Sequence, residues 1–283
     1  MLSVSVLTLV RDRQAHLDQL IAGVSRSSVA PDEIVIVDMS DRPLEIRGAQ
    51  APTRHLTLSG ADLPLAGARN LAAHEASGDI LLFLDVDCIV SAALIGRLAE
   101  RLARTDAVVC PEALYLPAQD APYPAADAAL RALAEPHPVR PFPPSGERLE
   151  SNPGLFWSLA FALRRETFQR LGGFDPAYVG YGAEDTDFGF QVARAGLPLI
   201  FLGGHPVFHQ HHDGCDPPLQ HFDALTVNAR HFRAKWGRWP MEGWLEAMRR
   251  LGLIRWTGET LEVLRQPTET EILRARKPAN ARF

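Results

Sequence analysis

Cysteine and long apolar runs are scarce in this sequence of 283 residues. Its three cysteines, Cys88, Cys110 and Cys215, are too few and too widely spaced for a disulfide framework or a cysteine-based zinc site. We expect them to be core or bystander thiols. No apolar run reaches the roughly 18 residues that a membrane-spanning helix needs, and residues 1–6 follow no basic segment of the kind that begins a secretory signal. These absences favour a cytoplasmic protein.

Positive charge is also scarce, because the net charge is −5 at pH 7 and the sequence pI is near 6.1. This balance gives no support for nucleic acid as the main partner. The G-x-G-x-x-G fingerprint of dinucleotide folds is missing after the first predicted strand, which counts against a dehydrogenase and leaves phosphates to a metal ion and arginines. Apolar residues are plentiful at 46%, which is ample for the core of one large or two small domains.

The most informative stretch is an apolar strand that ends in acid. Residues 80–84 are apolar throughout and lead directly into Asp85 and, one residue further, Asp87. Such a run is typical of a parallel strand covered on both faces, and ligands of open α/β sheets bind outside the carboxyl ends of these strands. Carboxylates suit Mg²⁺ or Mn²⁺ carrying a diphosphate, so one acid is expected to face a metal and the other a sugar hydroxyl. The alternative is a chance D-x-D pattern in a loop.

The first part of the chain predicts a β-α-β unit. Residues 3–10 and 34–38 are β-branched and apolar, and between them apolar positions recur at helical spacing over residues 14–25. Asp38 ends the second strand at the same sheet edge as Asp85, where an acid commonly accepts hydrogens from a base or ribose. Capping of the next turn is the alternative role for Asp38.

Other elements surround the acidic strand end. In a helix expected over 64–77, Arg69 either contacts a diphosphate or is a simple surface residue. Eight prolines between 117 and 144 exclude a long regular element there, which favours a mobile flap beside the active site or, alternatively, a disordered loop. The remaining predictions are helices over 92–104, 125–134 and 164–171, and strands over 108–110 and 156–163.

A cluster of acids follows flexible glycines in the second half of the chain. Glu184, Asp185 and Asp187 come directly after Gly180-Tyr181-Gly182-Ala183. Acids favour the start of a helix, here one that runs to about residue 195, and a carboxylate held at a helix start is also able to act as a base. The two roles are compatible.

Histidines are dense a little further on. Neutral imidazole binds borderline divalent metals, so this cluster predicts a metal ligand. Most of its members are then expected to face solvent or to lie around the metal site without binding the metal. A zinc site built from the cluster alone is the alternative. Its members are His205, His209, His211 and His212.

From residue 216 onward the sequence predicts a helical extension. Asp216 and Pro217 suit the N-cap and the first position of a helix. The tail is basic and is expected to be frayed, and contact with an anionic membrane surface is a weaker alternative. Its basic residues are Arg265, Arg274, Arg276, Lys277 and Arg282.

In this order and at these separations, the motifs over residues 3–236 resemble those of nucleotide-sugar glycosyltransferases of the GT-A fold, in the broad family 2 group. The similarity is nearest to β-1,4-galactosyltransferases and chondroitin-polymerase-type transferases. Tyr181 and Ala183 stand where those galactosyltransferases have tryptophan and glycine. The segments that carry the resemblance are residues 10–17 (a uridine-binding loop), Asp85-Val86-Asp87 (the metal-binding D-x-D), residues 180–185 (the G-W-G-G-E-D acceptor and base motif) and residues 208–210 (a later histidine ligand).

The resemblance implies an α/β fold with a Rossmann-like, mainly parallel central sheet flanked by helices. It implies a catalytic domain over residues 1–215, in which 1–110 bind the nucleotide sugar and 111–215 bind the acceptor and carry the flap. Residues 216–283 then form the C-terminal helical extension.

The implied reaction is metal-dependent, inverting transfer of a hexose or N-acetylhexosamine from a UDP-sugar to a hydroxyl of a saccharide or lipid-linked acceptor. A carboxylate must take the acceptor proton, and Asp185 is expected to do so while Glu184 orients hydroxyls. Tyr181 is expected to stack on a sugar ring. The remaining expected roles are donor binding by Arg11, Arg13, Asp38, Arg69 and Asp85, and ligation of Mn²⁺ or Mg²⁺ by Asp87 and His209.

Two other functions compete with this one. A nucleotidyltransferase also combines an α/β sheet, paired acids and a metal, but it usually has a glycine-rich, basic phosphate loop near the N-terminus, and residues 8–16 are poor in glycine. A carbohydrate- or nucleotide-binding protein without turnover is the second. The intact set of Asp85, Asp87, Asp185 and His209 argues against it.

Overall fold

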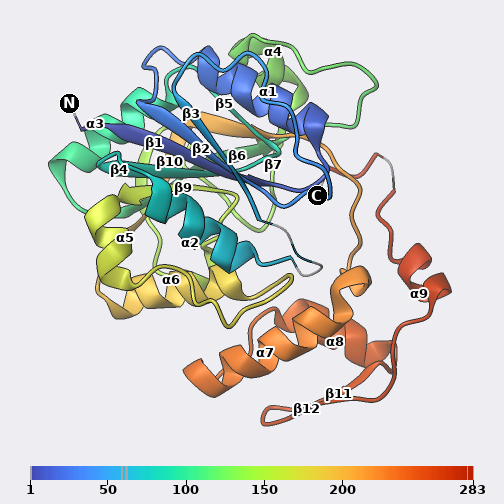
Figure 1. Cartoon of the computed structure of the whole chain (residues 1–283). Helices are drawn as coiled ribbons and strands as arrows, with labels where there is room; N and C mark the ends of the chain where they lie inside the picture. Colours follow the sequence, from blue (N-terminus) through green and yellow to red (C-terminus); the bar gives the residue numbers. More distant parts are fainter. Residues whose placement is uncertain (1, 59, 61–62, 279, 283) are drawn as a thin grey trace.

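A computed structural model describes residues 2–58, 60, 63–278 and 280–282. Its centre is a ten-stranded sheet with the order β3-β2-β1-β4-β9-β6-β10-β5, in which β7 pairs with β6 and β8 pairs with β10 (Figure 1). The strands are β1 (Val4–Val10), β2 (Glu33–Asp38), β3 (Thr53–Thr57), β4 (Ile80–Asp85), β5 (Cys88–Val90), β6 (Val108–Tyr115), β7 (Glu135–Pro136), β8 (Gly146–Leu149), β9 (Ala160–Arg164) and β10 (Leu199–His209).

Helices cover both faces of this sheet, as the sequence predicts for α/β architecture. In Figure 1, α1, α3 and α4 lie on one side and α2, α5 and α6 on the other. Parallel pairing joins β3, β2, β1 and β4, and also joins β6 to β10, whereas β9 and β5 run antiparallel to their neighbours. The helices are α1 (Gln14–Ser25), α2 (Leu65–Glu75), α3 (Leu94–Arg104), α4 (Asp127–Leu133), α5 (Arg165–Leu171) and α6 (Glu184–Arg194).

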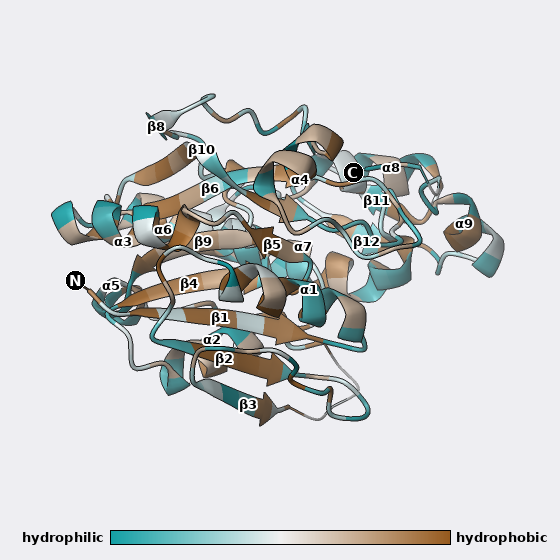
Figure 2. Ribbon diagram, turned by 90° about the horizontal axis from the view of Figure 1, so that it is seen from above, coloured by the Kyte–Doolittle hydropathy of each residue, from teal (hydrophilic) through white to brown (hydrophobic). Residues whose placement is uncertain are grey.

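Two apolar cores lie on opposite faces of the central strands. Strands β1 and β4 alternate between the two cores, which explains why their sequences are apolar almost without interruption (Figure 2). On the α6 side, Phe83 stacks on Phe161 with ring centroids 4.5 Å apart. Further phenylalanine rings, among them Phe174 and Phe188, extend this cluster beneath α6. Phe188 belongs to α6, so its contacts with Phe161 and Phe174 pack this helix onto the aromatic cluster.

Strand register brings distant polar residues to one edge of the sheet. After β4 the chain turns through Val86 and Asp87 into the short strand β5, which pairs antiparallel with the end of β10. In that ladder His209 lies opposite Cys88, the residue that follows Asp87. The carboxyl ends of β4 and β10 consequently meet, although they are far apart in the sequence.

Several predicted boundaries in the first 215 residues were wrong. Strand β6 continues past residue 110 to Tyr115, because Pro111 lies where the β6–β10 pairing is irregular and a missing N–H is tolerated. Strand β9 begins at Ala160, not 156, because its ladder with β4 ends at the Leu84–Ala160 pair. The 117–144 segment contains α4 close to the expected position, and it is folded: the Tyr123 hydroxyl donates to the Pro117 carbonyl. Closure of this segment over a ligand stays a prediction.

The C-terminal extension forms its own lobe with a third apolar core (Figure 1). It contains a small antiparallel hairpin as well as the predicted helices. Its elements are α7 (Phe222–Trp236), α8 (Glu242–Arg250), β11 (Ile254–Trp256), β12 (Leu261–Val263) and α9 (Glu269–Arg274), preceded by a 3-10 turn at Leu219–His221.

Two details of the extension differ from expectation. Helix α7 begins at Phe222 and is not capped by Asp216, since Pro217 precedes a second proline and such a residue disfavours helical geometry. The tail is not frayed over its described residues: the Lys277 N–H donates to the Gly214 carbonyl at 2.9 Å, and the Arg282 side chain donates to the Leu133 carbonyl. Among the described residues every helix is too short or too polar to cross a membrane. All three cysteines are free, as predicted.

Candidate active site

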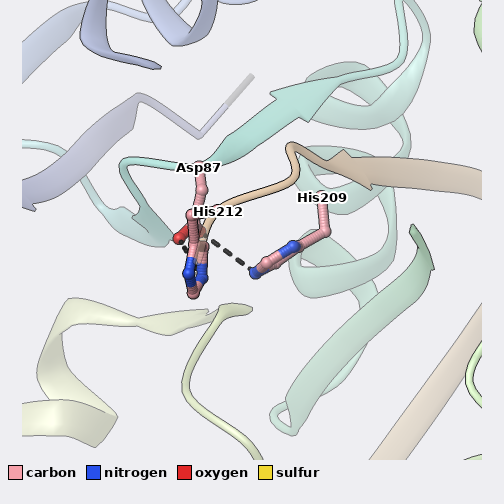
Figure 3. Close-up of side chains that lie close together, drawn as sticks. All are labelled: Asp87, His209 and His212. Atoms are coloured by element: carbon pink, nitrogen blue, oxygen red, sulfur yellow. Dashed lines mark ion pairs between the residues drawn. The ribbon is translucent and has the colours of Figure 1, made fainter. Parts of the chain in front are cut away.

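The strongest metal-binding arrangement combines one carboxylate with two imidazoles. Asp87 Oδ1 lies 3.4 Å from His209 Nε2, and Asp87 Oδ2 lies 3.3 Å from His212 Nε2 (Figure 3). One ligand atom from each residue lies within 4.8 Å of the other two. Asp87 is buried, and its Oδ1 has no hydrogen-bond partner among the described residues. An unsatisfied buried carboxylate oxygen beside two imidazoles is what a divalent-ion site requires, so these residues fit Mn²⁺ or a similar ion.

The protonation of this cluster also suits an ion. Burial lowers the pKa of His209 to about 4, although the neighbouring Asp87 opposes the shift. The imidazole is therefore neutral near pH 7 and able to ligate a metal. Burial by itself raises the pKa of Asp87, but His209, His212 and Arg13 outweigh it and hold that pKa below its usual range. Asp87 is accordingly an anion.

The structure brings two of the four clustered histidines beside Asp87, and metal ligation by them stays a prediction. His209 lies in the cluster as expected, and His212 joins it, a residue that sequence reasoning left among four equivalent candidates. His205 and His211 do not belong to this cluster as the structure describes it, so the alternative of a zinc site made from the four histidines alone was wrong. His205 lies within the irregular part of β10 between Leu202 and Val207, and His211 lies in the loop after the strand, so strand alternation does not decide which histidines meet.

A second polar centre is organised around Arg69. Its guanidinium is 3% exposed and lies between two acids, with Nη2 3.1 Å from Asp85 Oδ1 and Nη1 3.2 Å from Glu184 Oε1. Phe174 covers one side of it, with the guanidinium carbon 5.3 Å from the ring centroid. The alternative of a simple surface arginine was therefore wrong. Arg69 joins α2 to the ends of β4 and the start of α6.

The acids around Arg69 have raised pKa values. Burial raises the pKa of Glu184 to about 7, with a further contribution from Asp185 and an opposing one from Arg69. Burial likewise raises the pKa of Asp85 to about 6, against the influence of Arg69. The pKa of Asp185 is raised as well, again mainly by burial. Carboxylates whose pKa values approach the working pH are suited to proton transfer.

Asp185 is the freer of the two adjacent acids. Glu184 is buried and bound by Arg69, whereas Asp185 is partly exposed and accepts hydrogen bonds from the N–H and the hydroxyl of Thr186 at 2.6 and 3.3 Å. Both lie in the first turn of α6, where the helix dipole favours negative charge. Asp185 is thus the better placed to reach a ligand.

Tyr181 is engaged by the C-terminal extension. Its ring stacks on His221 with centroids 4.7 Å apart, and Trp244 lies beyond at 6.1 Å. Burial, and to a smaller extent the charges of Glu184 and Asp185, raise the pKa of its hydroxyl. His221 therefore covers one face of the Tyr181 ring, and stacking of Tyr181 on a sugar stays a prediction.

The residues expected at the nucleotide lie in three different settings. Arg13 Nη1 donates to Asp87 Oδ2 at 2.9 Å, so it belongs to the metal cluster's surroundings. Arg11 is about one-third exposed at the end of β1. Asp38 is buried and accepts hydrogen bonds from the N–H groups of Ser40 and Leu44 at 2.9 and 2.7 Å, the geometry of the turn-capping alternative. Contact between these residues and a nucleotide is an untested prediction.

Comparison with solved structures defines the class of fold. The chain superposes with a TM-score of 0.57 on S. aureus TarS 1–349 in complex with UDP-GlcNAc, at 12% identity and covering 82% of this chain and 66% of that one. It also superposes on GalNAc-T7 with UDP, GalNAc and Mn²⁺, with a TM-score of 0.55, 17% identity, and 75% and 44% coverage. The fold is therefore that of the GT-A transferases, as the motifs predicted.

Sequence comparison then gives the family. The model of glycosyl transferase family 2 matches residues 5–172, more than half of the chain, so the chain belongs to that family. The model described as the N-terminal domain of galactosyltransferase matches residues 142–213, the stretch that contains the acidic start of α6 and His209.

The curated relatives are longer than this chain. Polypeptide N-acetylgalactosaminyltransferase 10 of Rattus norvegicus is 32% identical over 180 residues, which are 58% of this chain and 30% of that protein. Validoxylamine A glucosyltransferase of Streptomyces hygroscopicus subsp. limoneus is 25% identical over 229 residues, which are 69% of this chain and 49% of that protein. The chain thus spans less than half the length of these relatives.

Proposed function

We propose that this protein transfers a hexose or N-acetylhexosamine from a UDP-sugar to an acceptor hydroxyl, with inversion at the anomeric carbon and with a divalent cation. The observation that carries the proposal is the Asp87, His209 and His212 cluster beside the acids held by Arg69. The names of two relatives, polypeptide N-acetylgalactosaminyltransferase 10 and validoxylamine A glucosyltransferase, support the transfer of such a sugar. Two neighbouring structures hold a uridine nucleotide, one as UDP with Mn²⁺ and one as UDP-GlcNAc.

Departure of UDP is the electrostatic problem in this reaction. A divalent ion held by Asp87, His209 and His212 would supply positive charge at the leaving diphosphate. Arg13 already contacts Asp87 and is placed to bind a phosphate oxygen when donor enters. Arg69 would act on the donor site through Asp85 and Glu184, with which it forms ion pairs, and its direct contact with a diphosphate stays a prediction.

Attack by the acceptor requires removal of one proton. The acceptor oxygen forms a bond to the anomeric carbon, the bond from that carbon to the UDP oxygen breaks, and UDP leaves with the electron pair. Asp185 accepts the hydroxyl proton, for which its partial exposure and raised pKa suit it. Glu184, buried against Arg69, orients donor or acceptor hydroxyls. With one base and no protein nucleophile, the product has inverted configuration.

A nucleotidyltransferase is less well supported. The connection between β1 and α1 is Arg11-Asp12-Arg13, without glycine, so it offers no flexible cradle for phosphates. Membership of glycosyl transferase family 2 also favours a glycosyltransferase over a nucleotidyltransferase.

Calorimetry of UDP binding tests the metal site. Wild type should bind UDP more tightly with Mn²⁺ than with chelator, since the cluster supplies negative charge that an ion must bridge to the diphosphate. Asp87→Ala and His209→Ala should abolish that gain. His205→Ala is a matched control, because it lies on the same strand β10 but outside the cluster, and it should retain the gain. Equal affinity of wild type with and without chelator would contradict the proposal.

A further inference from the structure

Helix α7 of the C-terminal extension packs directly on the turn that leads into the catalytic acids. That turn has left-handed backbone at Gly180, Gly182 and Ala183, with φ of 77°, 100° and 71°. A Cβ on Gly180 would lie 2.5 Å from the Ala224 side chain, and one on Gly182 would lie 2.6 Å from the Leu225 side chain. Both neighbours belong to α7. The glycines therefore serve close approach to this helix as well as backbone geometry.

Asn228, at the centre of α7, binds the turn through its side chain. Asn228 is buried, and its Nδ2 donates to the carbonyls of Val179 and Gly182 at 3.1 and 2.9 Å. These two carbonyls flank Tyr181 on either side. The amide therefore clamps the segment that carries Tyr181 and delivers the chain to Glu184.

A second contact fixes the first turn of α6. Asp187 is completely buried and accepts hydrogen bonds from Lys235 Nζ at 2.9 Å and Trp236 Nε1 at 2.6 Å, both from α7. Lys235 also donates to Asp175 at 2.9 Å, and Tyr178 donates to Asp187 at 3.2 Å. Asp187 is only two residues from Asp185, so anchoring it sets the rotation of the helix turn from which Asp185 projects.

We propose that α7 is part of the catalytic apparatus, with Asn228 and Lys235 as positioning residues that aim Asp185 and Tyr181 at the acceptor. The inference rests on the function proposed above. The metal cluster comes from the β4–β5 turn, β10 and the loop that follows, and within the described part of the chain it has no hydrogen bond to α7. Donor binding and acceptor activation should therefore respond differently to changes in this helix.

The test measures three quantities on Asn228→Ala, Lys235→Met and Lys235→Arg: Mn²⁺-dependent UDP affinity, kcat for donor hydrolysis or transfer, and the unfolding temperature. Misplacing a reacting group by about an ångström costs on the order of 100-fold. We expect kcat to fall roughly 10- to 100-fold in Asn228→Ala and Lys235→Met while UDP affinity stays within about twofold. Lys235→Arg keeps a positive charge between the carboxylates of Asp175 and Asp187, so its kcat should lie between those of Lys235→Met and wild type.

Val227→Ala is the matched control, because Val227 lies next to Asn228 on α7 with a side chain 57% exposed. It should match wild type in all three measurements. Unchanged kcat in Asn228→Ala and Lys235→Met would overturn the inference, and so would a parallel loss of kcat and UDP affinity. If Lys235→Met does not fold, Asn228→Ala and Lys235→Arg decide the matter. A wild type that neither binds UDP with Mn²⁺ nor turns over a UDP-sugar refutes the proposed function instead.

Discussion

Removing Arg69 should destabilise the protein in a manner that depends on pH. Arg69→Met keeps most of the side-chain length and the contact with Phe174, but it leaves Asp85 and Glu184 without their cation. Removing one member of a buried ion pair typically costs about 3–5 kcal/mol, because the remaining charge is uncompensated. We expect Arg69→Met to lower the free energy of unfolding by that amount at pH 8.

The sign of the pH dependence follows from Glu184. Its pKa in the folded protein is raised to about 7, above the roughly 4.3 of an unfolded glutamate, so its ionised form opposes folding. Arg69 limits that rise, and without it the pKa moves higher still. Below pH of about 6 the Glu184 carboxyl is protonated in the folded wild type and in the folded Arg69→Met variant. Its contribution to the free energy of unfolding then no longer depends on Arg69. The stability difference should therefore shrink to about 1 kcal/mol or less at pH 5.

Urea unfolding at pH 5 and pH 8, with chelator present, measures both values. Arg47→Met is the control, since Arg47 is 56% exposed in its pair with Glu45 and should change stability little at either pH. A loss of equal size at the two pH values would refute the reasoning, because it would mean that packing and not charge accounts for the effect. A loss no larger than that of the control would refute it as well.

Two further predictions concern chemistry and motion. Asp185→Asn keeps the shape of the side chain, so it should spare Mn²⁺-dependent UDP affinity while kcat falls on the order of 10²–10⁴-fold. Loss of UDP binding in this variant would instead make Asp185 a donor ligand. A product of retained anomeric configuration, detected by NMR, would exclude the inverting mechanism. Limited proteolysis within 117–144 should slow when UDP and Mn²⁺ are added, because closure over a donor excludes water, and unchanged cleavage would count against a flap.

Local sequence patterns predicted the N-terminal half of the sheet well. Strands β1, β2 and β4 are covered on both faces, so apolar residues dominate them, interrupted only by Ser5 and Thr8 in β1 and by acids at the ends of β2 and β4. Strand β10 was not predicted, because Gly203, Gly204 and Pro206 interrupt it. The structure accommodates this interruption as an irregularity between Leu202 and Val207 in the ladder with β6, a device that depends on a partner strand far away in the sequence.

The site was predictable as a set of residue types but not as a set of contacts. Asp87 and His209 were paired only through the family resemblance, and the structure brings them together through the β5–β10 ladder. The contact that buries Arg69 against Glu184 and the one by which Asn228 anchors Gly182 join residues 115 and 46 positions apart. Such contacts leave no periodic signal near either residue, so one sequence does not reveal them.

The β5–β10 ladder also has a consequence for how the protein folds. Cys88 and His209 pair although they are far apart in the sequence, and closing so long a loop is slow compared with forming local helices. Side chains alternate across a strand, so a slip of one residue in this ladder would turn His209 away from Asp87. Under the proposed function, capture of a divalent ion becomes possible only when the edge of the sheet has closed in the correct register. Under the same proposal, chains that have formed only the N-terminal β-α-β unit would lack this means of holding an ion.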